Sequence, residues 1–444
     1  MTDADDAPRA SGVFRSLRHR NFRLYATGSI LSNVGTWMQR IAQDWLVLQL
    51  TGQDPVALGT VTFLQFVPTL LLGMVGGVLA DRMDKRDVLR ITQSVVAFSA
   101  AVLGVLIMTD LVAVWQVYAL ALALGVANAI EAPSRTSIAS ELVPPEDLVN
   151  AVGLNSSSFN AARLVGPALS GVLIGWIGTG PVFLINALSS VWIIVLLSMI
   201  DRSRMYDVHR AGRQPGQIRE ALRYVRGRQD LTLIIALATC CSLFGLNLQV
   251  LIPLVSTHIF HQGAAQYGLL ASALALGTLT GALLSANRKS RPRLRGLVGS
   301  ALLFGLAEVA IAWVDVYWLF AVLLVPVGVV SLYFLISANS AVQLSVDSAT
   351  RGRVMALYFV ALMGTGAFGA PLVGWMTDLW GIQVALALCG ALTALSAVCI
   401  GGILIHRLGG LRVQTHLHSR PHLSVRIGDE TMIPYRREPL EEIT

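Results

Sequence analysis

Charged and amide side chains interrupt several long apolar segments of this 444-residue chain. Arg40 and Asp44 stand four residues apart, so in a helix they share a face and can neutralise each other. Arg163 stands in the middle of another apolar segment, one helical turn after Asn160. A charge at the centre of a membrane helix costs about 2.5–3.5 kcal/mol even on the most lenient scale, so these residues are candidates for binding a polar ligand or a proton.

Glu131 lies near the end of a further apolar segment, four residues before Arg135. Three roles suit it: a carboxylate that carries a proton, the ion-pair partner of Arg135, or an end residue that reaches the membrane surface. Arg40 and Asp44 also have a purely structural alternative, in which each charge only compensates the other. Spacing leaves these alternatives open.

The elements that must position these side chains are the apolar segments themselves. The chain is 54% hydrophobic and only 13% charged, a balance too apolar for a soluble protein of this size. About 20 helical residues cross the hydrocarbon core of a bilayer, and the segments lack the alternation of barrel strands. We therefore predict an all-α integral membrane protein with 12 transmembrane helices, at 22–49, 57–80, 88–108, 112–134, 148–176, 180–200, 231–257, 264–286, 295–313, 316–340, 350–377 and 381–405.

Arginine and lysine gather in alternate connections between the spans, at 82–90, 202–228 and 288–295, and before the first span. Because basic loops stay on the cytoplasmic side, we expect both termini in the cytoplasm of a multi-pass protein of the bacterial inner membrane. These loops are expected to contact anionic lipid and not nucleic acid, since no DNA-binding motif accompanies them.

Motifs that would indicate catalysis or a bound cofactor are absent from the sequence. Neither lysine follows a glycine, so there is no Gly-x-x-x-x-Gly-Lys phosphate loop, and no His-Glu-x-x-His metal motif occurs. The cysteines fall inside predicted spans, where we interpret them as packing residues. We expect no enzyme activity, no cofactor and no metal, and an ion gradient as the energy source.

Three residue pairs recur at one spacing along the chain. Gly77 and Gly281, Lys85 and Lys289, and Pro167 and Pro371 are each 204 residues apart. A parallel duplication of six helices accounts for this spacing. We predict two pseudo-symmetric six-helix bundles, with an N-terminal segment at 1–21, the first bundle at 22–200, a basic cytoplasmic linker at 201–229, the second bundle at 230–405 and a cytoplasmic tail at 406–444.

The segment from Gly77 to Arg86 places a glycine, an acid and a basic pair between the second and third spans. It resembles the signature of the major facilitator superfamily, and departs from it at Asp84, where many members have glycine. With the segments 21–51 and 143–151, residues 15–405 resemble the bacterial branch of enterobactin exporters and the third drug:proton antiporter group, the branch of transmembrane secretion effectors. The resemblance implies a transporter that works by alternating access.

In such a fold the signature acts as a conformational latch. Asp81 would meet the positive N-terminal end of the eleventh helix, or Arg351 and Arg353 just before it. The alternative is that the basic residues only fix the topology, but an acid contributes little to topology, which favours the latch for Asp81. The predicted latch comprises Gly77, Asp81, Arg82, Lys85, Arg86, Arg351 and Arg353.

A glycine–proline motif in the fifth span is similar to one associated with exporters of this superfamily, although its final glycine pair is incomplete. Proline frees a backbone carbonyl and glycine allows close helix approach, so we expect this segment to bend and pack tightly. Ordinary small-residue packing is the alternative, and it implies no direction of transport. The motif and its repeat in the eleventh span comprise Gly166, Pro167, Gly171, Gly369, Pro371 and Gly374.

Helices seven and ten line the cavity in this superfamily, so the resemblance adds further substrate-site candidates: Asn247, Gln249, Asn339 and Gln343. Glu308 falls on the ninth helix, outside the cavity, and is assigned to packing or an interhelical hydrogen bond. Many drug:proton antiporters carry an arginine in the middle of helix four. Nothing basic stands at the corresponding place near Ala121, which leaves Arg163 on the next helix as a substitute.

The hypothesis is a secondary active transporter that exports a small amphipathic molecule, a siderophore, drug or secondary metabolite, by proton antiport. The alternatives are an importer on the same fold, or a membrane receptor or scaffold that no longer transports. The expected partners are the small-molecule substrate, protons and membrane lipid, with the protein a monomer.

Overall fold

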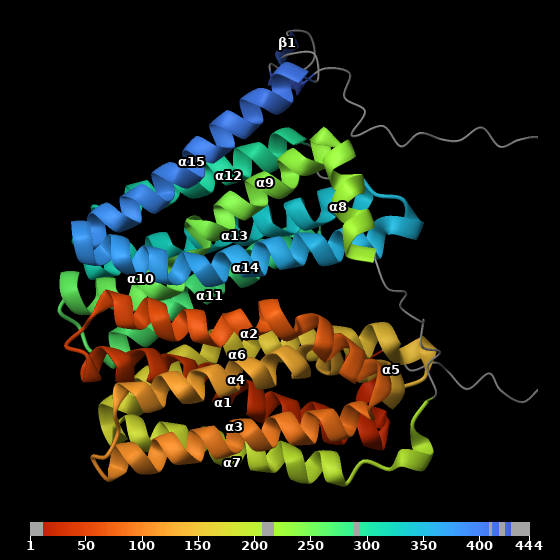
Figure 1. Cartoon of the computed structure of the whole chain (residues 1–444), viewed down its shortest axis with the longest axis vertical. Helices are drawn as coiled ribbons and strands as arrows, with labels where there is room; N and C mark the ends of the chain where they lie inside the picture. Colours follow the sequence, from red (N-terminus) through yellow and green to blue (C-terminus); the bar gives the residue numbers. More distant parts are fainter. Residues whose placement is uncertain (1–11, 207–216, 288–293, 408–410, 417–421, 428–444) are drawn as a thin grey trace, which may run out of the picture. The chain divides into compact units, whose positions relative to one another are not determined.

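The computed structural model describes residues 12–206, 217–287, 294–407, 411–416 and 422–427. Long helices dominate these ranges (Figure 1). The helices are η1 (Arg15–Arg18), α1 (Arg20–Leu50), α2 (Pro55–Arg82), α3 (Lys85–Met108), α4 (Val114–Ser137), α5 (Ala139–Leu142), η2 (Pro145–Asp147), α6 (Leu148–Ile177), α7 (Thr179–Ser198), η3 (Arg202–Arg204), α8 (Gln217–Gly227), α9 (Gln229–Leu243), η4 (Gly245–Asn247), α10 (Leu248–Leu254), η5 (Val255–Ile259), α11 (Ala264–Ala286), α12 (Leu294–Ile311), α13 (Tyr317–Leu344), α14 (Ser348–Trp380) and α15 (Ile382–Arg407).

The twelve predicted spans all fall on helices, the seventh on the series from α9 to η5. In the part of the chain that the structure describes, 11 helical segments are long and apolar enough to cross a membrane. They do not include α1, in which Arg40 and Asp44 stand among glutamines. The all-helical membrane fold is thus confirmed, whereas the count of twelve crossing helices stays a prediction.

Contacts divide the chain into two compact units. Unit 1 comprises Met1–Arg213 and Ile252–Ala275, and unit 2 comprises Gln214–Leu251 and Leu276–Thr444. The segment Ile252–Ala275, which the predicted repeat assigns to the second bundle, belongs to unit 1 because the first half of α11 packs against α6 and reaches α1. The boundary between the two contact-defined units therefore differs from the boundary between the two predicted bundles.

Helices at corresponding places of the two predicted bundles pack against each other in each unit. α1 packs on α6 and α7 in unit 1, and α9 packs on α14 and α15 in unit 2; likewise α3 packs on α7, and α12 on α15. Small residues let the backbones approach closely at these crossings. A β-carbon at Gly104 would press on Leu184 of α7, and one at Gly305 would collide with Ala394 of α15.

The ends of α6 and α14 also match. Each helix is followed by a glycine with positive φ, Gly178 at 82° and Gly381 at 81°, whose N–H donates back into the helix. Glycine takes this left-handed conformation without strain, so it terminates both helices at the same place in the repeat.

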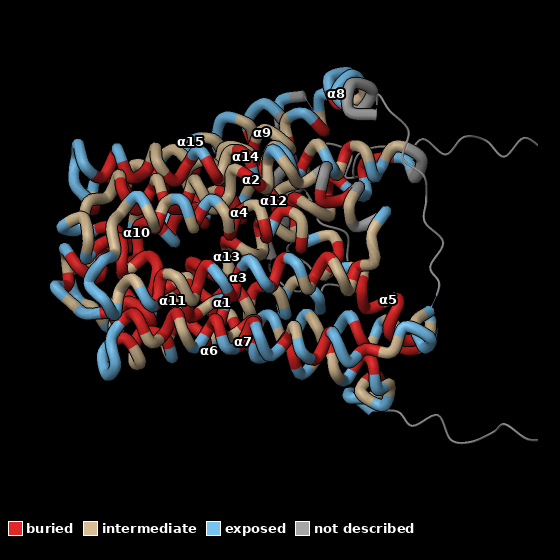
Figure 2. The backbone as a smooth tube through the Cα atoms, turned by 60° about the horizontal axis from the view of Figure 1, so that its bottom comes forward, coloured by how far each residue is buried: buried red, intermediate tan, exposed pale blue. Residues whose placement is uncertain are grey.

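Buried and exposed residues alternate along the helices (Figure 2). The buried positions build a core in each unit, with Phe22 and Leu89 in unit 1 and Leu231 and Phe334 in unit 2. Large apolar side chains are also exposed, among them Trp176 at 80%. An apolar exterior of this kind suits contact with lipid tails.

The seventh predicted span is not one continuous helix. α9 ends at Leu243, and the short turn η4 follows, in which Leu246 has a non-helical ψ of 15°. α10 then contains Pro253 and passes into the π-helical turn η5. Proline removes a ladder hydrogen bond and π-turns widen a helix, so this span is broken in two places.

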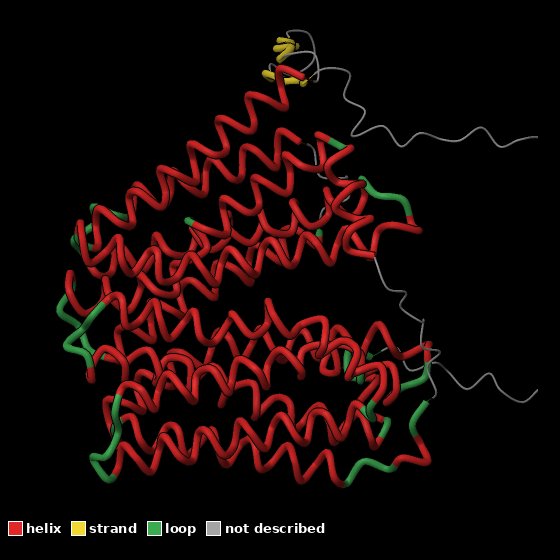
Figure 3. The backbone as a smooth tube through the Cα atoms, viewed as in Figure 1, coloured by secondary structure: helices red, strands yellow, loops and turns green. Residues whose placement is uncertain are grey.

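Two strands lie beyond α15, β1 (Leu411–His416) and β2 (His422–Ile427) (Figure 3). They form an antiparallel pair in which Leu411 is opposite Ile427 and Val413 is opposite Val425. We predicted no regular element in this tail. Apolar residues at every second position explain the strands.

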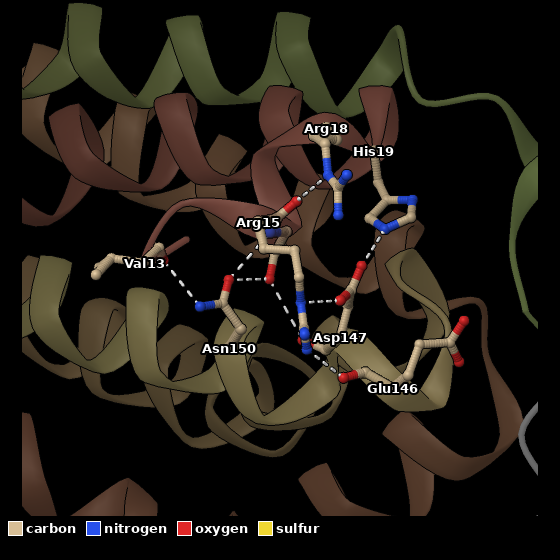
Figure 4. Close-up of polar contacts among 8 residues, drawn as sticks. Val13, Arg15, Arg18, His19, Glu146, Asp147 and Asn150 are labelled. Carbon is tan, nitrogen blue, oxygen red and sulfur yellow. Dashed lines mark hydrogen bonds and ion pairs between the residues drawn. The ribbon is translucent and has the colours of Figure 1, made fainter. Parts of the chain in front are cut away.

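The N-terminal turn η1 is fixed to the start of α6 (Figure 4). Asp147 pairs with both Arg15 and His19, the latter at 2.7 Å between Nε2 and Oδ2. Asn150 donates from Nδ2 to the carbonyl oxygen of Val13 at 2.8 Å. The segment 143–151, part of the family resemblance, therefore anchors the chain before α1.

Candidate functional site

A cavity of about 270 Å³ lies inside unit 1, lined by residues of α1, α2, α3, α4, α6 and α7. Its wall mixes aromatic rings with an unusual number of side-chain amides. The amides are those of Asn33, Gln39, Gln43, Gln65, Gln93, Asn128 and Asn186. A site of this composition hydrogen-bonds a polar group while burying apolar surface.

Glu131 is the centre of a hydrogen-bonded network on one side of the cavity. Its side chain is buried, and its Oε1 accepts from Nε of Arg135 at 2.6 Å. Gln93 of α3 donates from Nε2 to both carboxylate oxygens at 3.0 Å. Arg135 donates onward from Nη1 to Oδ1 of Asn33 at 2.8 Å. The carboxylate is thus satisfied by residues of two helices, and α1 joins the network through Asn33.

Two arginines lie near the indole ring of Trp37 on α1. The Arg40 guanidinium carbon is 5.5 Å from the centroid of this ring, and that of Arg163 on α6 is 5.7 Å from it. Arg40 also lies 4.9 Å from the Phe66 ring of α2. The two arginines that the sequence singled out on separate spans therefore meet at one residue.

Asp44 accepts a hydrogen bond from the Tyr267 hydroxyl of α11, 2.8 Å from Oδ2, in a buried environment. No ion pair joins Asp44 to Arg40, although the structure describes both side chains. The predicted neutralising pair is therefore not a direct contact, and Asp44 connects α1 to α11 within unit 1.

The glycine–proline motif of α6 also packs against α11. A β-carbon at Gly171 would collide with the Ala264 carbonyl oxygen, and one at Gly268 with that of Pro167. The Ser272 hydroxyl donates to the Leu164 carbonyl oxygen at 2.7 Å and accepts from the Ala168 N–H at 3.1 Å. Ser272 thus hydrogen-bonds two backbone groups, four residues apart, that a regular helix would pair with each other.

Known proteins resemble this chain over most of its length. The profile of the family described as transmembrane secretion effector matches residues 11–426. The chain belongs to this family of the major facilitator superfamily. It is 25% identical to the staphyloferrin A transporter of Staphylococcus aureus over 391 residues, covering 85% of this chain and 94% of that protein. It is 29% identical to the multidrug efflux pump Tap of Mycobacterium tuberculosis, covering 88% and 93% of the two chains.

Solved structures of the superfamily share the fold. A bacterial homologue of the human lysosomal transporter Spinster, in an inward-facing and occupied conformation, superimposes with a TM-score of 0.68 at 14% identity, covering 88% of this chain and 97% of that one. The nucleoside transporter NupG gives the same TM-score at 13% identity, covering 86% and 98%. The predicted fold class is confirmed by these matches.

The signature loop makes several contacts inside unit 1. Lys85 pairs with Glu141 of α5 at 2.8 Å, and Arg86 donates from Nη1 to the carbonyl oxygen of Ile200 at 2.8 Å. The side chain of Asp81 lies outside the described part of the chain, so its partner stays a prediction. Gly77 is buried, Arg82 is exposed and Arg351 donates to the Val346 carbonyl oxygen at 3.5 Å.

The loop after α7 contributes to the same end of unit 1. Arg202 contacts Asp87 at 2.5 Å and Asp84 at 3.3 Å, while Asp201 accepts from the hydroxyl and backbone N–H of Ser203. These two hydrogen bonds lower the pKa of the Asp201 carboxyl by stabilising its charged form.

The candidates in unit 2 do not form a comparable network. Asn247 is buried and donates to the carbonyl oxygens of Ser242 and Leu243, so its amide supports the break after α9. Gln343 donates to Asn339 at 2.6 Å on the exposed side of α13, and Gln249 is exposed on α10. The copy of the glycine–proline motif in α14 is explained by packing, since Gly369 lies against Asn247.

The remaining candidates are Asn160 on α6 and Pro371 and Gly374 on α14. Asn160 donates from its amide to the Ser156 carbonyl oxygen one turn earlier at 2.9 Å. Pro371 and Gly374 lie inside α14. Among the described residues, no group of three or more His, Cys, Asp or Glu side chains is placed to hold a metal ion.

Several residues of the site were not predicted from the sequence. Asn33, Trp37 and Gln93 carry the network and the arginine contacts, yet none is charged. A signal existed for α1, because Asn33, Trp37 and Arg40 recur at helical spacing and therefore share one face. Gln93 had no such signal, since a single glutamine in an apolar span is uninformative.

Proposed function

We propose that this secretion effector exports a small amphipathic molecule across the bacterial inner membrane by alternating access, in exchange for protons. The cavity of unit 1 is the observation that carries the proposal. Side-chain amides, Arg40, Arg135 and aromatic rings line it on helices that are otherwise apolar, and Arg163 lies beside Trp37 of its wall. The relatives described as a siderophore transporter and as a multidrug efflux pump favour export.

Glu131 is the proposed proton carrier. Its carboxylate lies on the cavity wall and is held by Arg135 and Gln93. Protonation would remove the charge that Arg135 needs, so Arg135 would exchange Glu131 for another acceptor. Substrate transport is coupled to proton movement if substrate binding and proton binding compete for this network.

The remaining parts of the proposal concern topology and assembly. The basic connections favour a topology in which both termini lie in the cytoplasm and these connections face anionic lipid. The protein acts as a monomer of two pseudo-symmetric six-helix bundles, with a basic linker at 201–229, and Asp81 latches the cytoplasmic side.

Metabolite profiling followed by vesicle transport tests the function. Deletion of the gene should raise one or more compounds inside the cell and deplete them from the medium. Such a compound should then enter inverted vesicles that contain the protein and maintain a proton gradient, and a protonophore should abolish its uptake. Glu131→Gln should lose gradient-driven uptake, and Asp378→Asn, at an exposed acid of α14, should keep it.

Each alternative gives a different result. Accumulation of a compound in right-side-out vesicles would indicate import. An unchanged metabolite profile after deletion, with no gradient-driven uptake of any profiled compound, would indicate a receptor or scaffold. Protonophore-insensitive uptake would contradict proton coupling and leave export intact.

A further inference from the structure

Two positive charges share one aromatic ring at the cavity. Trp37 lines the cavity, and the guanidinium groups of Arg40 and Arg163 each lie within 6 Å of its centroid, at 5.5 and 5.7 Å. A guanidinium is attracted to the ring face, but the ring leaves its full positive charge in place. The two arginines come from α1 and α6, so their approach is a product of the fold and not of sequence proximity.

The neighbouring carboxylates are engaged elsewhere. Asp44 accepts from Tyr267, and Glu131 accepts from Arg135 and Gln93. Within the described residues, neither Arg40 nor Arg163 forms an ion pair or a hydrogen bond with another side chain. Asp44 attracts Arg40 through space without a direct contact, whereas the charged neighbour that acts on Arg163 is Arg40. An anion bound near Trp37 would therefore relieve the repulsion between the two arginines.

The surroundings define the rest of the ligand. Phe66 lies under Arg40, and Phe159 packs edge-on against Trp37 with the ring centroids 5.8 Å apart. Each arginine offers a planar set of donors that matches a carboxylate, and the rings offer apolar surface beside it. A ligand with an anionic group attached to an apolar or aromatic body satisfies both features.

We infer that Arg40 and Arg163 form an anion-binding subsite over Trp37, and that the exported substrate carries a carboxylate beside an apolar body. The inference rests on the proposed function, since it takes the cavity to be the substrate site. If the two arginines had a purely structural role, the cavity would bind a charged and a neutral ligand of the same shape equally well. A comparison of the two affinities therefore distinguishes the roles.

Isothermal titration calorimetry on the purified full chain in phosphatidylcholine nanodiscs provides the measurement. The probes are naphthalene carboxylate and its neutral carboxamide, which share one ring system. The carboxylate should bind at least about tenfold more tightly, the size expected for one charge-assisted hydrogen bond. Arg40→Gln and Arg163→Gln should each abolish this preference, and Arg226→Gln, an exposed arginine of α8, should retain it.

Conservative variants guard against loss of folding. Arg40→Lys and Arg163→Lys keep the charge and should keep part of the preference, while binding of the carboxamide stays unchanged. Equal affinity of the two probes for the unaltered chain would overturn the inference, as would a preference that survives in both glutamine variants. Either result leaves export itself untouched, because export is measured by metabolite profiling.

Anionic lipid is the other source of the same chemistry. Replacing phosphatidylcholine by phosphatidylglycerol in the nanodiscs should leave the affinity for naphthalene carboxylate unchanged. A fall in that affinity which disappears in Arg163→Gln would mean that lipid headgroups occupy the subsite, and would overturn its assignment to substrate.

Discussion

The two units treat buried carboxylates in opposite ways. In unit 1, Glu131 accepts from Arg135 and Gln93, and Asp44 accepts from Tyr267. In unit 2, Glu308 of α12 is fully buried at 0% exposure, and within the described residues neither of its carboxyl oxygens has a hydrogen-bond partner. Glu131 lies on the cavity wall of unit 1 and Asp44 connects α1 to α11, whereas Glu308 lies in a packed interior.

This difference separates buried polar groups that can contribute to ligand binding from those that only lower the stability of the fold. A buried polar atom without a partner costs about 1–3 kcal/mol, and an arrangement in which every atom is paired avoids that cost. The network of unit 1 can therefore hold charge around a ligand at little expense. Glu308 destabilises unit 2 as it stands, and an interhelical hydrogen bond, one of its two predicted roles, is absent from the described contacts.

Removing Arg135 should give the largest effect, because it would bring Glu131 closer to the situation of Glu308, with only the Gln93 amide left as a donor. Arg135→Ala would leave the carboxylate of Glu131 buried without its charged partner, and breaking a buried ion pair costs about 3–5 kcal/mol. The free energy of unfolding in detergent, measured by thermal or denaturant unfolding, should fall by that amount.

The exposed arginine Arg226 supplies the control, since Arg226→Ala removes an equal charge and should change stability by less than about 0.5 kcal/mol. The double variant Glu131→Gln with Arg135→Ala should recover part of the loss, because the unpaired charge is gone. If Arg135→Ala is as stable as the unaltered chain, the network of unit 1 is not a stabilising one.

Replacing Glu308 should have the opposite sign and a smaller size. Glu308→Met fills a similar volume and removes both unpartnered oxygens, so the free energy of unfolding should rise by about 1–3 kcal/mol. Asp378→Met, at an exposed acid of α14, is the matched control and should not stabilise. Destabilisation by Glu308→Met would show that the carboxyl group has a function in unit 2 that packing does not explain.

Much of the fold follows from the sequence because the membrane leaves few choices. Apolar length predicts the helices, and the pairs Gly178 with Gly381 and α3–α7 with α12–α15 match the spacing of the predicted repeat. The break after α9 was missed, because a change of backbone conformation at Gly245–Asn247 leaves hydropathy unaltered. Contacts between distant segments, such as Tyr267 with Asp44, were also missed, because spacing along one helix gives no information about a partner on another.

The charged residues of the site could be predicted from the sequence. Arg40 and Glu131 line the cavity and Arg163 lies beside Trp37 of its wall; all three stood out because an ionisable residue in an apolar span is costly. Uncharged residues such as Trp37 and Gln93 complete the site without any such signal. Their role appears only when three helices are brought together.

Tyr267→Phe should give the smallest effect and tests whether Asp44 and Glu131 depend equally on their partners. The change removes one hydroxyl donor from Asp44 at nearly constant volume, so the free energy of unfolding should fall by about 1 kcal/mol, the usual contribution of a single hydrogen bond. Tyr206→Phe, at an exposed tyrosine, is the control and should be neutral. A loss as large as that of Arg135→Ala would mean that Asp44, like Glu131, depends strongly on a single partner. Asp44 and Glu131 would then differ from the unpartnered Glu308 to the same degree. A loss near zero would instead align Asp44 with Glu308, and would restrict the satisfied network of unit 1 to Glu131.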